Sequence, residues 1–253
     1  MPLRVEGREH RRARRAHEVI EAGDVEEARA SVRRLGPTKK VAIGPYPHCV
    51  TSDSRHANVQ FTAMAAGIGE AAAASATATA LALDPSIDLV INAGIAGGFA
   101  PRIGVGHVVI ADHIVAADLG AEESGSPGSL IPLSAMGYDG GDITCDPALV
   151  RRAAALTDAH VGMILTVSTI TANEERIDSF VRTHPSALAE AMEGHGVAVA
   201  AQAHGKPFLE LRTISNPVGV RDIGSWSMDE AFDALSNAIY TLLYSPDSDR
   251  LVQ

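Results

Sequence analysis

Short apolar stretches alternate with helical patterns along most of the chain, and this alternation constrains the fold more than any other feature of the sequence. Strand-like runs are expected at 41–44, 58–67, 88–99, 106–118, 163–170 and 207–215. Helical patterns are expected at 70–84, 146–157, 173–184, 194–205 and 227–244. Strands that alternate with helices form sheets covered on both faces. We therefore predict a three-layer α/β/α sandwich with a central mixed, largely parallel sheet.

The core of such a sheet must be built from small and aliphatic side chains. Hydrophobic residues make up 46% of the 253 residues, but aromatic residues only 4%. The segment 70–84 consists almost wholly of small residues and is expected to form a helix very close to the sheet. Cys49 and Cys145 are too few for a disulfide framework, and the histidines lack metal-ligand spacing. We expect a cytoplasmic protein without a metal or cofactor, since no secretory leader or membrane-spanning run is evident.

The net charge of −10 is unevenly distributed. Residues 1–40 contain eleven of the 21 Lys and Arg but only seven of the 31 Asp and Glu, so they carry +4 and the remainder −14. The acidic remainder argues against nucleic-acid binding. The basic run 8–17 is interpreted as a solvated helix face, with an arm that contacts RNA or another anionic partner as the alternative. We expect 1–40 to be an atypical helical N-terminal segment, broken at Gly23 before an N-cap at Asp24, and 41–253 to be the α/β domain.

Three strand exits carry glycine or polar residues, and ligands of α/β sheets bind at the carboxyl ends of strands. The glycine-rich turn 92–98 lets a ligand approach the backbone, although a tight turn with nothing bound is the alternative. Glu193 is a lone acidic residue between apolar and glycine neighbours, which suits either binding of ribose hydroxyls or capping of a helix. Asn216 closes a strand before a proline and is either a ligand group or a turn former.

A series of short motifs follows the first of these exits in a defined order. The motifs are GIAGGF (94–99), LTVSTIT (165–171), AMEG (191–194), RTISN (212–216), VGVRD (218–222) and Trp226. Their order and spacing resemble the purine nucleoside phosphorylase and nucleosidase superfamily, and within it the futalosine hydrolases of the menaquinone pathway. The resemblance covers about residues 60–245. It implies a nucleoside phosphorylase-like fold, hydrolysis of a purine nucleoside without a cofactor, and self-association as a dimer or larger homo-oligomer.

The resemblance also implies roles for individual residues. Met192 would pack against the sugar, and Glu193 would bind its 2′ and 3′ hydroxyls and stabilise the positive charge of the transition state. Asn216 occupies the position where adenine-specific nucleosidases have Asp. Its amide offers a donor and an acceptor together, which favours hypoxanthine as the leaving base. Ile170 and Thr171 would flank that base.

The residues of the glycine-rich turn distinguish a hydrolase from a phosphorylase. Where the related hexameric phosphorylases have an Arg and a Ser or Thr that bind phosphate, this chain has Asn92 and Ile95. Water is therefore the expected nucleophile. The residues expected to line the sugar pocket are Ala93, Gly94, Ile95 and Ala96. Arg221 is the candidate cation for the carboxylate on the 5′ chain of futalosine, because it lies close in sequence to Asn216.

The N-terminus departs from the superfamily pattern, which opens with an apolar strand followed by a Glu that positions the attacking water. The acids found there are Glu6 and Glu9, and neither follows a strand pattern. Either the strand is disguised, or the strand and its Glu are absent and the protein hydrolyses nucleosides slowly or only binds them. A methylthioadenosine or adenosylhomocysteine nucleosidase, a phosphorylase, and a nucleoside-binding protein with weak or no catalysis remain the alternatives.

Overall fold

The computed structural model describes residues 16–53, 59–125, 130–219, 222–245 and 251. Its strands are β1 (Ala16–Ala22), β2 (Lys39–Ile43), β3 (Tyr46–Asp53), β4 (Val59–Ala65), β5 (Leu89–Gly98), β6 (Val108–Ala116), β7 (Gly120–Glu122), β8 (Leu130–Pro132), β9 (Asp142–Thr144), β10 (His160–Thr166), β11 (Ala187–Ala191) and β12 (Phe208–Pro217). Its helices are α1 (Val25–Val32), α2 (Glu70–Leu83), α3 (Pro147–Thr157), α4 (Glu174–Thr183), α5 (Gly194–Ala203) and α6 (Met228–Tyr244), with 3-10 turns η1 (Leu133–Met136) and η2 (Ile223–Ser225).

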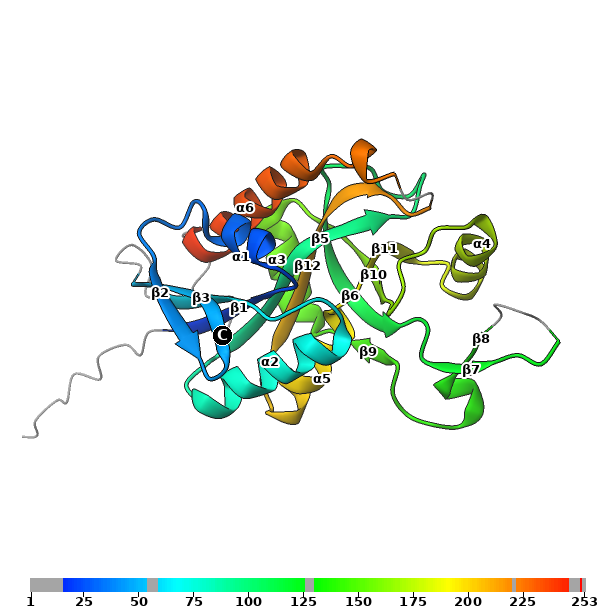
Figure 1. Ribbon diagram of the computed structural model, residues 1–253, viewed down its shortest axis with the longest axis horizontal. Helices are drawn as coiled ribbons and strands as arrows, with labels where there is room; N and C mark the ends of the chain where they lie inside the picture. The colour runs from blue at the N-terminus through cyan, green and yellow to red at the C-terminus, as the bar shows by residue number, and fades with distance from the viewer. Residues whose placement is uncertain (1–15, 54–58, 126–129, 220–221, 246–250, 252–253) are drawn as a thin grey trace, which may run out of the picture.

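A mixed sheet runs through the centre of the molecule, in the order β11-β10-β6-β12-β5-β1-β4-β3-β2, with β9 paired to β6 (Figure 1). Two parallel blocks, β4-β1-β5-β12 and β6-β10-β11, meet where β12 pairs with β6 in the antiparallel sense. β11 also pairs with the end of β5, which closes β5, β12, β6, β10 and β11 into a ring. The ring brings the carboxyl ends of strands from both blocks together.

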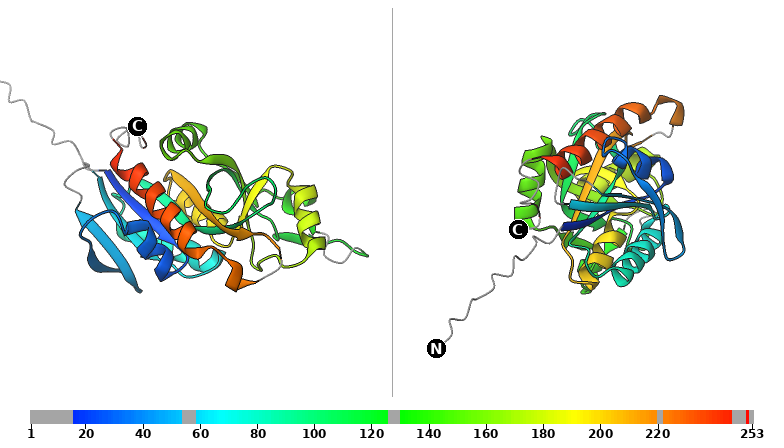
Figure 2. Two further views of the ribbon diagram at one scale, coloured as in Figure 1. Left: turned by 90° about the horizontal axis from the view of Figure 1, so that it is seen from above. Right: turned by 90° about the vertical axis from the view of Figure 1, so that its left-hand side faces the viewer.

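Helices cover the sheet on both faces, as Figure 2 shows from two further directions. α6 packs against α1 and α3 on one face, and α2 packs against α5 on the other. The small residues of α2 permit this close packing, since Ala73, Ala76 and Ala80 are buried with Val197 of α5. Gly196 is required there, because a Cβ atom at that position would lie 2.1 Å from the carbonyl oxygen of Glu70. The predicted helix at 70–84 thus lies against both the sheet and α5.

The structure corrects the expectation for the N-terminal segment. Residues 16–22 form a strand in the middle of the sheet, paired in parallel with β4 on one side and β5 on the other. Val19 and Ile20 are fully buried there, which explains why the segment is a strand although its sequence also fits a helix. The expected boundary at residue 40 lies inside β2, so residues 16–40 belong to the same sheet as the rest. The basic run up to residue 15, with Glu6 and Glu9, lies outside the described residues.

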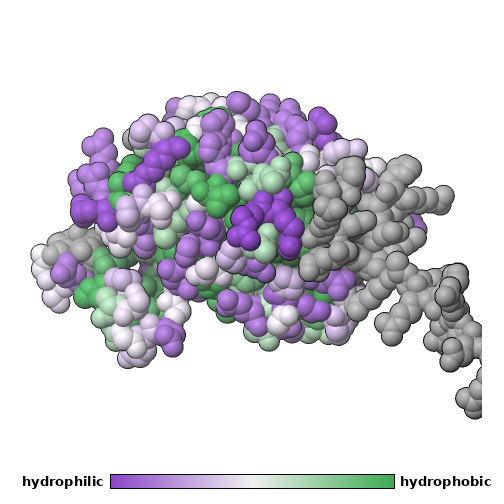
Figure 3. Space-filling view, turned by 180° about the vertical axis from the view of Figure 1, so that it is seen from behind, coloured by the Kyte–Doolittle hydropathy of each residue, from purple (hydrophilic) through white to green (hydrophobic). Residues whose placement is uncertain are grey.

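Most other expected elements are present with small shifts at their ends, but no strand is expected at the positions of β3, β7, β8, β9 and β11. The surface seen from behind is mostly hydrophilic, with smaller hydrophobic areas scattered between (Figure 3). Within the described ranges, no helix has the length and apolar character needed to cross a membrane. Cys49 and Cys145 are both buried and unpaired.

Candidate active site

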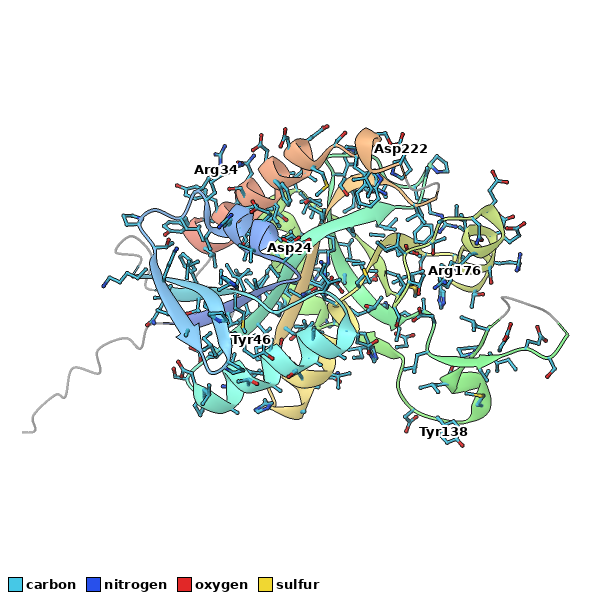
Figure 4. The ribbon with its side chains drawn as sticks, in the orientation of Figure 1. Asp24, Arg34, Tyr46, Tyr138, Arg176 and Asp222 are labelled. Carbon is cyan, nitrogen blue, oxygen red and sulfur yellow. The ribbon has the colours of Figure 1, made fainter. Side chains whose placement is uncertain are left out.

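A pocket opens where the carboxyl ends of β1, β5, β10, β11 and β12 meet. It is lined by Asp24, Glu27, Ile68, Ile95, Ala96, Gly97, Val167, Ile170, Thr171, Glu190, Ala191, Met192, Glu193, Ser215, Asn216, Val218, Gly219 and Trp226. Asp24, which follows β1 directly, lies near the middle of the molecule in Figure 4. The pocket therefore lies where open α/β sheets bind their ligands.

Glu27 enters the pocket from the first turn of α1. The helix begins with a capping box, in which Asp24 Oδ1 accepts from the Glu27 backbone N–H at 2.9 Å and Glu27 Oε2 accepts from the Asp24 N–H at 3.3 Å. The other oxygen, Oε1, accepts from the backbone N–H of Ile95 in β5 at 2.9 Å. Burial raises the pKa of Glu27 to about 7, with Arg212 opposing the rise and Glu193 adding to it. A carboxyl group of this pKa can take up a proton at neutral pH.

Glu193 lies at the start of α5 and is 5% exposed. Its Oε1 accepts from the backbone N–H of Gly69 at 3.2 Å, and its Oε2 lies 3.3 Å from Nη2 of Arg212. Gly23 allows Glu193 and Glu27 to approach each other, because a Cβ atom on Gly23 would lie 3.0 Å from an oxygen of each. Two carboxylates thus face the same part of the pocket.

Arg212 projects from β12 beneath these carboxylates and has no exposed surface. Its Nε donates to Glu210 Oε1 at 3.0 Å, and its Nη2 also donates to Asn92 Oδ1. Nη1 has no hydrogen-bond partner within the described part of the chain. Burial lowers the pKa of Arg212, but the neighbouring Glu210, Glu193 and Glu27 outweigh it, so the pKa lies above its usual value and the side chain stays charged.

Gly94 lets the Arg212 guanidinium and the Glu27 carboxyl group lie close against the backbone of β5. A Cβ atom built on Gly94 would lie 2.6 Å from Arg212 Nη1 and 2.7 Å from Glu27 Oε1. A carbon atom at either distance would overlap its neighbour, so only glycine fits at this position.

The far side of the pocket is lined by side chains that suit a purine base. Thr171 donates to Glu190 twice, from its backbone N–H at 2.8 Å and from its hydroxyl at 2.5 Å. Burial raises the pKa of Glu190, although these two hydrogen bonds oppose the rise. Asn216 Oδ1 accepts from the Ser215 hydroxyl at 2.8 Å, which fixes the amide at the end of β12. A hydroxyl, a carboxyl and an amide group are therefore the polar groups on a wall of the pocket that is otherwise apolar.

The structure brings most of the predicted site residues together. Those that line the pocket are Asn216, Glu193, Ile95, Ala96, Ile170, Thr171 and Met192. Ala93 is fully buried in β5 and does not line the pocket, and Gly94 lies behind the lining against Arg212 and Glu27. Arg221 lies outside the described residues. The described ranges contain no group of three or more His, Cys, Asp or Glu side chains placed to hold a metal ion.

Glu27 is the residue that sequence reasoning missed. The sequence predicts two helical pieces in 17–36, broken at Gly23, so no strand is expected before Asp24 and the acids considered are Glu6 and Glu9. The signal was present in the spacing of Asp24 and Glu27, which is that of a capping box. A capping box directly after a glycine indicates a new helix, and the residues before Gly23 can then be a strand.

Comparison with known proteins agrees with this geometry. A sequence profile described as the phosphorylase superfamily matches residues 19–242, which include β1 and Glu27. The chain belongs to this superfamily. The match begins at residue 19, inside β1, so it includes most of this strand.

Relatives in the phosphorylase superfamily include two futalosine hydrolases. The protein from Streptomyces coelicolor is 52% identical over 182 residues, which cover 70% of this chain and 75% of the relative. The protein from Acidothermus cellulolyticus is 44% identical over 209 residues, covering 79% and 82%. Among solved structures, an S-adenosylhomocysteine nucleosidase from Streptococcus pyogenes, in complex with 5-methylthiotubericidin, superposes with a TM-score of 0.76 at 23% identity over 91% of this chain and 97% of that one. This structural similarity confirms the predicted fold class.

Proposed function

We propose that this protein is a nucleosidase that hydrolyses the N-glycosidic bond of futalosine and releases hypoxanthine. The observation that carries the proposal is the cluster of Glu27, Glu193 and Arg212 beneath the pocket. It combines a proton acceptor with a pKa near 7, a second carboxylate and a buried guanidinium that pairs with that carboxylate. The identity with two futalosine hydrolases supports futalosine as the substrate.

In the proposed reaction, a water that binds Glu27 at the pocket wall attacks C1′ of the ribose while the bond to the base breaks. The water oxygen bonds to C1′, its proton passes to Glu27, and the electron pair of the broken bond leaves on the base, which takes up a proton from solvent. Glu193 binds the ribose hydroxyls, and its charge stabilises the cationic sugar more strongly in the transition state than in the ground state. Glu27 then returns its proton to solvent.

Water rather than phosphate is the proposed nucleophile because the pocket is acidic. Its described lining contains four carboxyl groups, those of Asp24, Glu27, Glu190 and Glu193, and no Lys or Arg. Arg212 lies behind the lining and is already paired with carboxylates. A phosphate ion would meet uncompensated negative charge at this site.

The Asn216 amide is proposed to select the base. Its fixed Oδ1 and Nδ2 present an acceptor and a donor to a 6-oxopurine such as hypoxanthine. A methylthioadenosine or S-adenosylhomocysteine nucleosidase is the second candidate, and the structural similarity to an S-adenosylhomocysteine nucleosidase supports it only at the level of the fold. A futalosine substrate would place the enzyme in menaquinone biosynthesis, in the cytoplasm, as a dimer or larger homo-oligomer.

The proposal is tested by incubating the protein with futalosine, inosine and methylthioadenosine, each with and without phosphate, and measuring the released base by chromatography. We expect release of hypoxanthine from futalosine at a rate independent of phosphate. Faster turnover of methylthioadenosine would favour the second candidate, and a requirement for phosphate would identify a phosphorylase. Binding without turnover of any nucleoside would contradict an enzymatic function.

A further inference from the structure

Glu210 is a buried carboxyl group in the same cluster that the proposed reaction does not use. It lies on β12 two residues before Arg212, so both side chains project from the same face of the strand. Glu210 has no exposed surface, and its Oε1 accepts from Arg212 Nε at 3.0 Å. Its Oε2 has no hydrogen-bond partner within the described residues. A buried charged group with an unused oxygen is costly to keep, so its presence calls for a reason.

The fold makes room for this carboxyl group at the start of α5. A Cβ atom on Gly194 would lie 2.2 Å from Glu210 Oε2, so only glycine fits above it. The charged or titratable groups that act on Glu210 are Arg212 on its own strand and Glu193 and His195 at the start of α5, and Glu210 in turn acts on Cys145. Burial raises the pKa of Glu210, and the adjacent Arg212 opposes the rise.

Arg212 is the one cation that Glu27, Glu193 and Glu210 share in the described part of the cluster. Paired with Glu193 alone, the guanidinium would cancel much of the negative charge that the cationic sugar requires. It would also lower the pKa of Glu27 further. A third carboxyl group, held on the side of Arg212 away from the pocket, reduces both effects.

We propose that Glu210 is a positioning residue for the hydrolysis. It holds the Arg212 guanidinium through Nε and offsets part of the guanidinium charge. The negative charge of Glu193 then remains available to the sugar, and that of Glu27 to the water. Glu210 acts through Arg212 and lines no part of the pocket. Its contribution therefore concerns the transition state, where positive charge develops on the sugar, and not the affinity for the substrate, whose ribose is uncharged. This inference rests on the proposed function.

The test compares Glu210→Gln with Glu210→Asp. Gln keeps the shape and an acceptor for Arg212 Nε but removes the charge, whereas Asp keeps the charge but shortens the side chain and leaves a gap. For Glu210→Gln we expect kcat for futalosine to fall roughly tenfold or more with KM within about twofold. We expect the acidic limb of the kcat/KM profile to move to lower pH by on the order of one unit, because uncompensated Arg212 lowers the pKa of Glu27. Glu210→Asp should keep this limb nearer to that of the unaltered enzyme.

A purely structural role predicts the opposite order, with the isosteric Gln variant nearly unchanged and the Asp variant most affected. That order, or a Gln variant with unaltered kcat and pH profile, would overturn the inference. Ser236→Ala is the matched control, since it alters a fully buried polar side chain of α6 that lines no part of the pocket. It should leave kcat and the profile unchanged.

The pH dependence of Tm includes the protonation of Glu27 without turnover, beside that of the other buried carboxyl groups Glu190 and Glu210, and the Tm shows whether each variant is folded. In the unaltered protein, Tm should fall with rising pH until Glu27 has lost its proton. In Glu210→Gln this fall should end at a lower pH, displaced by the same amount as the acidic limb of the kcat/KM profile. If the unaltered protein releases no base from futalosine, the proposed function fails, and any remaining shift in Tm shows only the charge coupling. If it does release hypoxanthine and neither readout shifts in Glu210→Gln, the inference fails and the function stands.

Discussion

Replacing Gly94 by Ala places one methyl group against both Arg212 and Glu27, the residue proposed to activate the water. The Cβ atom would lie 2.6 Å from Arg212 Nη1 and 2.7 Å from Glu27 Oε1, and ordinary contacts begin near 3.4 Å. Relief of the clash requires a displacement of about 0.8 Å. Neither neighbour moves freely, because Glu27 accepts from Ile95 N–H at 2.9 Å and Arg212 donates to Glu210 at 3.0 Å.

The expected result is a large loss of rate with a moderate loss of stability. A misplacement of about 1 Å in a catalytic group costs about 10²-fold in rate, and overpacking a core costs about 1–3 kcal/mol in the free energy of unfolding. The assay measures kcat and KM for futalosine together with the urea unfolding curve. Gly104→Ala is the matched control, since nothing lies within 4 Å of a Cβ atom there. A Gly94→Ala enzyme whose kcat stays within threefold of the control would refute the claim that close packing on Gly94 positions Glu27 for the reaction.

Three further predictions concern protonation, base selection and the pocket wall. Because folding raises the pKa of Glu27 from 4.5 to about 7, its contribution favours the folded state most below pH 4.5 and is lost as the pH rises to 7. The loss amounts to about 3 kcal/mol, so Glu27→Gln should raise Tm more at pH 8 than at pH 5. Asn216→Asp should raise kcat/KM for methylthioadenosine relative to futalosine by about tenfold, measured in competition, and an unchanged ratio would exclude Asn216 as the selecting residue. Thr171→Val removes the hydroxyl that donates to Glu190 at 2.5 Å and should cost about 1–3 kcal/mol in urea unfolding, whereas a cost near zero would show that water replaces it.

The sequence predicts the fold well where the apolar pattern is long. The strands at 89–98 and 208–217 and the helix at 228–244 carry ten or more residues of consistent pattern and were predicted within a few residues. β1 is different, because Val19 and Ile20 stand between glutamates and fit a helix as well as a strand. It is a strand because it pairs with β4 on one side and β5 on the other, and no local sequence pattern predicts this pairing.

The site likewise contains residues that a local pattern identifies and residues whose positions depend on distant segments. Glu193 and Asn216 were predicted because each stands at the end of a recognisable element. Glu27 became visible only when β1 placed the start of α1 against β5. Arg212 and Glu210 are two charged residues at alternate positions of an apolar strand, a spacing that puts both on one face and indicates a buried ion pair. Their contacts with Glu193 and Asn92 depend on segments far away in the sequence.

The pH dependence of kcat/KM for futalosine, compared between the unaltered enzyme and Glu27→Gln, tests the central claim that Glu27 activates the water. The unaltered enzyme should gain activity as the pH rises through about 7, where Glu27 loses its proton. Glu27→Gln should lose about 10²–10⁴-fold in kcat/KM and retain no such rise. A variant that keeps activity within a few fold of the unaltered enzyme, with the rise near pH 7 intact, would contradict the account.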